Sequence, residues 1–241
     1  MLFIYVTLIK FIYKVIFVKK FIMHNTVKNL LYIEDLIKTK VNDLNKDKIP
    51  KIIAVSKTFP MEKVLPLLEY GHLNFGENKV QEALDKWTDI KSKNKNIKLH
   101  LIGRLQTNKV KFALGLFDFI HSLDSEKLAN KIANEQAKQG KKPKIFIQVN
   151  IGNEEQKSGI KKEKLADFHK FCKNLDLDIV GTMCIPPNDK NTENYFSEMD
   201  IINQKLNFQE LSIGMSADYL NAVKNGATYV RVGSKIFGER H

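Results

Sequence analysis

The sequence predicts a single (β/α)₈ barrel, and three observations support this fold class. Eight short apolar runs recur after about residue 26, and most are followed by a segment with helical periodicity. The 241 residues, 43% of them hydrophobic, are enough for one barrel-sized core. No G-x-G-x-x-G pattern follows the first strand, which disfavours the alternative, a doubly wound open sheet.

The elements are expected in strict alternation. The run 52–55 is apolar without alternation and rich in β-branched residues, which is typical of a strand buried on both faces. Helices are predicted over 61–71, over 125–140 with Ser125 as N-cap, and over 216–226, each closing at a glycine. The eight expected strands are 51–57, 72–77, 98–103, 117–123, 144–150, 178–185, 209–215 and 228–234.

The two ends of the chain depart from this alternation. Few residues follow the eighth strand, so the helix expected there is very short or missing, and the amphipathic segment 25–44 is expected to cover the gap. Residues 1–24 are apolar with scattered lysines and no acid, and we predict that they lie outside the fold. A targeting segment and a true start at Met23 are the leading interpretations; Lys10 and Lys14 interrupt the apolar run, which disfavours a membrane anchor. The predicted division is therefore an extension over 1–24 and a barrel over 25–241.

Charge and cysteine usage narrow the class of protein. The formal net charge of +12 raises the question of nucleic acid, but the lysines are spread along the chain and do not alternate with aromatic residues. We expect no nucleic-acid partner and no stable membrane insertion of the barrel. Cys172 and Cys184 form no C-x-x-C pair, so neither disulfides nor a metal site is predicted, and a cytoplasmic location fits best, with organellar targeting by residues 1–24 as the alternative.

In a (β/α)₈ barrel the functional site lies at the carboxyl ends of the strands, and phosphate is often bound by the loops after strands seven and eight. The stretches "SIGMS" (212–216), running into the expected helix, and "RVGS" (231–234) offer unobstructed backbone N–H groups there. Lys57 follows the first strand, which neighbours the eighth in a closed barrel. An amine beside a phosphate site suggests capture of a phosphorylated aldehyde or ketone as a Schiff base, because partial burial and a cationic neighbour lower a lysine pKa.

Each of these residues also has a simpler structural interpretation. Gly214 and Gly233 are suited to turns, and Ser216 to a helix cap. Arg231 within a strand is harder to explain structurally, because a guanidinium that points into the barrel needs an anion or another acceptor.

Three further polar residues lie near strand ends. Glu77 and Asn78 stand where a helix begins, and helix capping is the structural alternative to a role in the site. His100 is interpreted as a core histidine with satisfied hydrogen bonds.

Seven motifs, in order, resemble the pyridoxal phosphate (PLP) homeostasis family: "AVSKTFP", "FGENKVQEALDK", "HLIGRLQTNK", "IQVNIGNEEQKSGI", "GTMCIP", "LSIGMSADYLNAV" and "VRVGSKIFGER". The resemblance covers about residues 26 to 240. It implies a barrel of the alanine-racemase type (PLP fold type III) that holds pyridoxal 5'-phosphate as a Schiff base on Lys57. By the same match, the residues implied to hold the phosphate are Ser216, Gly233 and Ser234, with Arg231 near the pyridine nitrogen and Asn78 near the ring.

The sequence departs from the family pattern at one position. Arg104 stands after "HLIG", where many relatives have a small residue, proline or histidine. It adds a cation next to the end of the third strand.

The resemblance also implies a function without efficient catalysis. The family carries or buffers PLP in intracellular vitamin B6 homeostasis, with PLP-dependent apo-enzymes as expected partners, and an arginine at the ring nitrogen weakens the electron sink. A PLP-dependent amino-acid racemase is the alternative; it needs a base opposite Lys57 and a second domain, for which few residues remain after the eighth strand. A Schiff-base aldolase acting on a sugar phosphate is a third hypothesis, with Glu77 or His100 as candidate acids. We assign no catalytic residue.

Overall fold

Eight parallel strands form a closed barrel in the computed structural model, which describes residues 23–239. The strands follow one another around the barrel from β1 to β8, and β8 pairs with β1. The predicted (β/α)₈ barrel is thus confirmed, and the doubly wound alternative is wrong. The strands are β1 (Lys51–Val55), β2 (Asn74–Glu77), β3 (Lys98–Leu101), β4 (Phe119–Leu123), β5 (Lys144–Gln148), β6 (Ile179–Met183), β7 (Glu210–Met215) and β8 (Tyr229–Val232).

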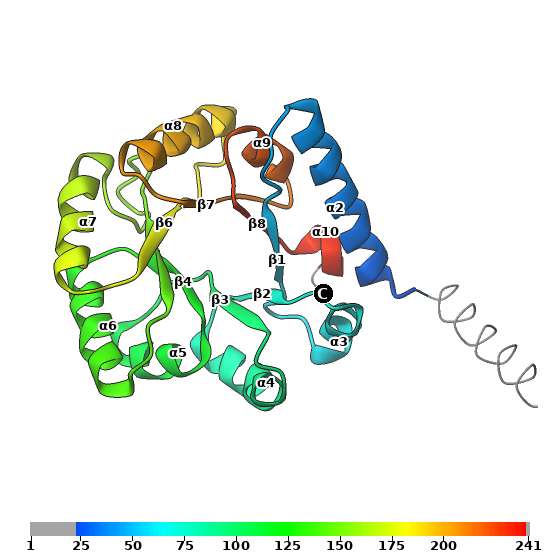
Figure 1. The fold of residues 1–241 in the computed structure, drawn as a ribbon, viewed down its shortest axis with the longest axis horizontal. Helices are drawn as coiled ribbons and strands as arrows, with labels where there is room; N and C mark the ends of the chain where they lie inside the picture. Colours follow the sequence, from blue (N-terminus) through cyan, green and yellow to red (C-terminus); the bar gives the residue numbers. More distant parts are fainter. Residues whose placement is uncertain (1–22, 240–241) are drawn as a thin grey trace, which may run out of the picture.

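Helices surround the strands on the outside of the barrel (Figure 1). They are α2 (Asn25–Asp43), α3 (Met61–Tyr70), α4 (Val80–Lys93), α5 (Val110–Leu116), α6 (Glu126–Gln139), α7 (Leu165–Asn174), α8 (Thr192–Lys205), α9 (Tyr219–Lys224) and α10 (Ser234–Phe237). Two 3₁₀ turns, η1 (Thr107–Lys109) and η2 (Lys162–Lys164), precede α5 and α7.

Local sequence signals set most helix ends. Gly71 and Gly140 terminate α3 and α6 in the left-handed conformation, with φ of 101° and 63°. Ser125 caps α6, its Oγ accepting from the N–H of Leu128. These three predictions are confirmed.

The helix after β8 has only four residues, as predicted, and α2 covers the gap it leaves. α2 lies beside α9 and α10 (Figure 1), and Asn29 Nδ2 donates to Ile236 O at 3.0 Å. The buried apolar side chains of α2 follow helical spacing and form a stripe that faces the core. Burial of each of these side chains stabilises the fold by about 1.5–3 kcal/mol. The stripe consists of Val27, Leu30, Ile33, Ile37 and Val41.

The two described residues before α2 already contact the rest of the fold. Met23 packs against the core, and the His24 side chain accepts from the N–H of Thr26 at the start of α2. Residues 1–22 of the predicted extension lie outside the described residues. Among residues 23–239, no helix is long and apolar enough to cross a membrane.

The hydrophobic core has two layers, and strand alternation decides which side chains enter each. Ile53 and Val55 of β1 lie inside the barrel with Tyr229 of β8, whereas Ile52 and Ala54 belong to the layer between strands and helices. Odd-numbered residues of β1 and β8 therefore point inward. This parity places the Arg231 side chain inside the barrel. The chain leaves β1 after Val55 at the carboxyl end of the barrel.

Candidate functional site

The predicted site residues gather at the carboxyl end of the barrel, which we call the mouth. β1 pairs with β8 through Ile53 and Arg231, and with β2 through Val55 and Gly76. The Ser56 N–H, directly before Lys57, donates to Gly76 O at 3.0 Å, and a Cβ on Gly233 would lie 3.4 Å from Val55 Cβ. Parallel pairing thus brings together segments more than 170 residues apart.

Lys57 lies in the turn that ends β1, and its side chain is half-buried. The next residue, Thr58, has a positive φ of 66°, which is unusual for a β-branched residue. Its N–H donates to Glu82 Oε1 at 2.6 Å, so a carboxylate from α4 supports the strained conformation. Strain of this kind, held by a neighbouring element, is typical of functional sites.

A hydroxyl and a backbone N–H meet on the β8 side of the mouth. Ser216 Oγ accepts from the N–H of Gly233 at 3.1 Å. Ser234 follows and is exposed. These residues, implied by the family resemblance to hold a phosphate, therefore lie together.

The segment after β7 differs from the prediction of a helix running from Ser216. α9 begins only at Tyr219, because Gly214 turns the chain with a φ of 86° and Asp218 Oδ1 accepts from the N–H of Met215 at 2.6 Å. A Cβ on Gly214 would lie 2.4 Å from Ala222 Cβ, so this turn also packs tightly on α9. Ser216 is consequently a turn residue with its hydroxyl directed at Gly233 rather than a helix cap.

Arg231 is buried inside the barrel and satisfied by neutral acceptors. Its Nη1 donates to Ser212 O at 2.7 Å and to Ser212 Oγ at 2.8 Å, and its Nη2 donates to Cys184 O at 2.8 Å. A guanidinium has five N–H donors, so two remain without a hydrogen-bond partner among the described residues. Burial lowers the pKa of Arg231, since removal from water disfavours its charge.

A hydrogen-bonded row of side chains, the interior polar chain, continues from Arg231 through the barrel. Ser212 Oγ lies 3.0 Å from His121 Nδ1, His121 Nε2 lies 3.0 Å from His100 Nδ1, and His100 Nε2 lies 3.2 Å from Asn74 Oδ1. Sequence reasoning identified only His100, as a satisfied core histidine, and that interpretation is confirmed. His121 and Ser212 were missed, although both occupy predicted strands.

Asn74 sets the direction of the protons in this chain, because its Oδ1 can only accept and His100 Nε2 must therefore donate to it. A neutral His100 then accepts at Nδ1 from His121 Nε2, and a neutral His121 accepts at Nδ1 from the Ser212 hydroxyl. Ser212 Oγ in turn accepts from the Arg231 guanidinium. Both histidines are therefore neutral Nε2–H tautomers. Burial holds the pKa of each well below its ordinary value, and the charge of Arg231 lowers the pKa of His121 further.

Glu77 does not cap α4, so that structural interpretation was wrong. Lys79 occupies the cap position, and Glu77 is fully buried between β2 and α4. Its Oε1 accepts from Ser56 Oγ at 2.8 Å, Lys86 Nζ at 2.9 Å and Trp87 Nε1 at 2.9 Å. The hydrogen bond from Ser56 to the buried Glu77 carboxylate holds the residue directly before Lys57 in place.

Asn78 lies at the mouth and does not cap α4 either. Its Oδ1 is buried without a hydrogen-bond partner among the described residues. Gly103, after β3, presses against it: a Cβ there would lie 2.3 Å from Asn78 O. Arg104 is exposed on the same loop. An unsatisfied buried amide at this point is suited to a polar ligand.

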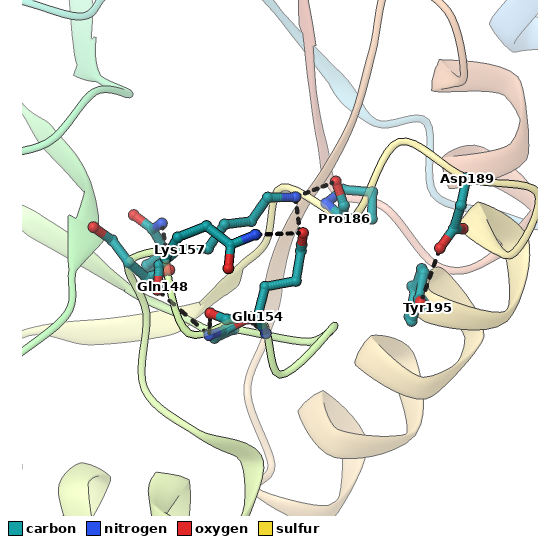
Figure 2. A network of polar contacts seen from close by, with 9 residues as sticks. Gln148, Glu154, Lys157, Pro186, Asp189 and Tyr195 are labelled. Atoms are coloured by element: carbon teal, nitrogen blue, oxygen red, sulfur yellow. Dashed lines mark hydrogen bonds and ion pairs between the residues drawn. The ribbon is translucent and has the colours of Figure 1, made fainter.

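The loops after β5 and β6 pack together at the same end (Figure 2). Lys157 Nζ lies 2.6 Å from Glu154 Oε2 and donates to Pro186 O at 3.3 Å. A Cβ on Gly152 would lie 2.3 Å from Pro187 Cγ. Lys157 is therefore engaged by its own loop and by the loop after β6.

Comparison with known proteins places the chain among barrels of the alanine racemase N-terminal type. A family model described as the alanine racemase N-terminal domain matches residues 35–241. The alanine racemase of Clostridium difficile shares the fold, with a TM-score of 0.64 at 14% identity over 86% of this chain and 57% of the racemase.

The nearer relatives specify the family. The pyridoxal phosphate homeostasis protein of Haemophilus influenzae is 38% identical over 230 residues, covering 90% of this chain and 97% of that protein. The human protein of the same name is 37% identical over 213 residues, covering 79% and 77%. PipY of Synechococcus elongatus, solved with PLP bound, matches with a TM-score of 0.73 at 31% identity over 84% of this chain and 100% of PipY. The chain belongs to the pyridoxal phosphate homeostasis family, and the resemblance predicted from its motifs is confirmed.

Proposed function

We propose that this protein binds pyridoxal 5'-phosphate at the mouth, through a covalent bond to Lys57, and carries or buffers it for PLP-dependent apo-enzymes. The names of the relatives and the PLP-bound structure of PipY support this function. The single observation that carries it is Arg231, a guanidinium with two free donors that is buried inside the barrel at the level of Ile53, on the strand that leads to Lys57. Two buried free thiols, Cys172 and Cys184, favour a reducing cytoplasmic location.

The residues at the mouth fit each part of PLP. Ser216 Oγ and the Gly233 N–H, 3.1 Å apart, would bind the phosphate together with Ser234. The unsatisfied Asn78 Oδ1 would accept from a polar group near the ring. An anion here also offsets the charge of Arg231, whose hydrogen-bond acceptors are all neutral.

The same arginine argues for binding without efficient turnover. PLP supplies an aldehyde for an amine and a ring that withdraws electrons best when its nitrogen is protonated. Arg231 stays protonated and can only donate, so a guanidinium hydrogen bond to that nitrogen would disfavour its protonation. We therefore propose a carrier rather than a racemase.

The test compares two lysines of the same face. Wild type, Lys57→Ala and Lys157→Ala are loaded with PLP, reduced with borohydride and mapped by mass spectrometry. We expect the adduct on Lys57 in wild type and in Lys157→Ala, and none in Lys57→Ala. An adduct of equal yield on another lysine in wild type and in Lys57→Ala would refute the assignment.

Turnover is tested separately by following α-proton exchange of L- and D-alanine in deuterated water. We expect at most slow exchange from one enantiomer. Rapid interconversion of the enantiomers by wild type, lost in Lys57→Ala, would favour the racemase.

A further inference from the structure

A cavity lies at the amino ends of the strands, opposite the mouth. Its volume is about 860 Å³, within the range of small-molecule sites. It is lined by the ends of α4 and α6, by α5, and by the first residues of β3, β4 and β5. We call it the basal cavity. α4, α5 and β3 lie side by side on this part of the barrel (Figure 1).

The lining of the basal cavity carries seven lysines and a single carboxylate, Asp118. Three of the lysines have ordinary structural partners. Lys91 donates to Leu116 O and Asp118 Oδ2, Lys141 donates to Gly115 O at 3.0 Å, and Lys142 pairs with an aspartate outside the cavity. Lysines at helix ends commonly stabilise terminal carbonyls in this way.

The other four lysines have no such explanation. The side-chain amines of Lys95, Lys98, Lys111 and Lys144 make no hydrogen bond or ion pair with any residue in 23–239. Lys144 Nζ only lies over a buried phenylalanine, 6.0 Å from the ring centroid. Exposed lysines elsewhere also lack a partner among the described residues, as Lys28 and Lys38 of α2 do, but these four lie together in the lining of one cavity. Lysines that are spread along the sequence are thus brought together in the basal cavity by the fold.

The crowding of these charges acts on Lys91. Burial lowers the pKa of Lys91, and repulsion by Lys98 and Lys141 lowers it further, although Asp118 acts against both. Binding of a multiply charged anion would relieve this repulsion.

One wall of the cavity is aromatic. Phe112 of α5 is 48% exposed and lines the cavity beside the stems of the lysines. Lys109 Nζ lies 5.9 Å from its ring centroid. An exposed aromatic face offers a base a surface to stack on, which contributes about 1–3 kcal/mol.

We propose that the basal cavity is a binding site for a nucleoside triphosphate, with the phosphates among the unpaired lysines and the base against Phe112. A triphosphate supplies several negative charges on a compact chain, which matches the excess positive charge of the lining. The site is separate from the mouth, so its occupation is independent of Lys57.

The test measures binding of ATP, tripolyphosphate and adenosine by isothermal titration calorimetry at low salt. The pocket variant is Lys95→Gln/Lys98→Gln/Lys111→Gln. The control, Lys28→Gln/Lys38→Gln/Lys205→Gln, makes the same charge change on exposed lysines of α2 and α8. We expect ATP affinity to fall at least tenfold in the pocket variant and less than twofold in the control, with a shallower salt dependence in the pocket variant.

Two further variants separate the parts of the proposal. Phe112→Ala should weaken ATP but not tripolyphosphate, and Lys57→Ala should bind ATP as wild type does. No ATP binding by wild type, an equal loss in the control triple variant, no effect of Phe112→Ala, or loss of ATP binding in Lys57→Ala would each overturn the proposal.

Discussion

Replacing His121 by phenylalanine tests the interior polar chain most directly. The His121 ring stacks on Phe146, with centroids 4.2 Å apart and planes inclined by 16°, and a phenyl ring preserves that packing. The substitution removes two hydrogen bonds at once. Ser212 loses the acceptor for its proton, and His100 Nδ1 loses its donor.

The size of the effect follows from burial. His100 and Ser212 are both fully buried, so neither polar group left unpaired can turn to water. Each unsatisfied buried group costs about 1–3 kcal/mol, which gives about 2–6 kcal/mol for His121→Phe. That is a large part of the roughly 5–15 kcal/mol by which a protein of this kind is stable.

Urea unfolding of wild type and variant measures this loss, and His169→Phe is the matched control. The His169 ring packs on Phe208 with centroids 4.5 Å apart, is half-buried, and makes no hydrogen bond to a residue in 23–239. We expect the control to change stability by less than about 0.5 kcal/mol. An equal loss in the two variants, or nitrogen NMR shifts that place the proton of His121 or His100 on Nδ1, would refute the directed chain.

Three other predictions follow from buried groups. Because both interior histidines stay neutral in the folded protein and protonate on unfolding, stability should fall as pH drops below about 6.5; in urea titrations between pH 7 and pH 5, wild type should lose on average about 1 kcal/mol per pH unit more than His121→Phe, approaching about 1.4 kcal/mol per pH unit near pH 5. Burial raises the pKa of Cys172 and Cys184 to about 12, so a thiol reagent at pH 8 should label neither until denaturant is added; rapid labelling of the folded protein would contradict this. Gly214→Ala should destabilise the protein by more than about 1 kcal/mol, since φ is 86° and the new Cβ would lie 2.4 Å from Ala222 Cβ, whereas Gly115→Ala, where a Cβ meets nothing within 4 Å, serves as the control in thermal melts.

The eight strands and most helix ends could be predicted because their signals are local. A run such as 52–55 carries its own β preference, and Gly71 and Gly140 end helices through their own backbone freedom. The eight-fold alternation then leaves few topologies, and the barrel fixes the end at which the site lies. This reasoning placed Lys57 and Gly233 at that end without any knowledge of contacts, and their role in binding stays a prediction.

Long-range contacts could not be predicted from the sequence, because they depend on how the strands and helices pack against one another. Glu77 was expected to cap a helix a few residues away, but it pairs with Lys86 across the interface of β2 and α4. The start of α9 at Tyr219 depends on the packing of Gly214 against that helix.

The sequence by itself determined the barrel, the family and the segments that build the mouth, since these follow from local pattern and motif. Only the tertiary structure decided how polar and charged side chains are partnered. His121 becomes one link of a directed proton chain because β3, β4 and β7 bring three side chains within hydrogen-bond distance inside the barrel. Lys98 and Lys111 line one cavity for the same reason. Electrostatic interactions act through space, and only the closed fold sets those distances.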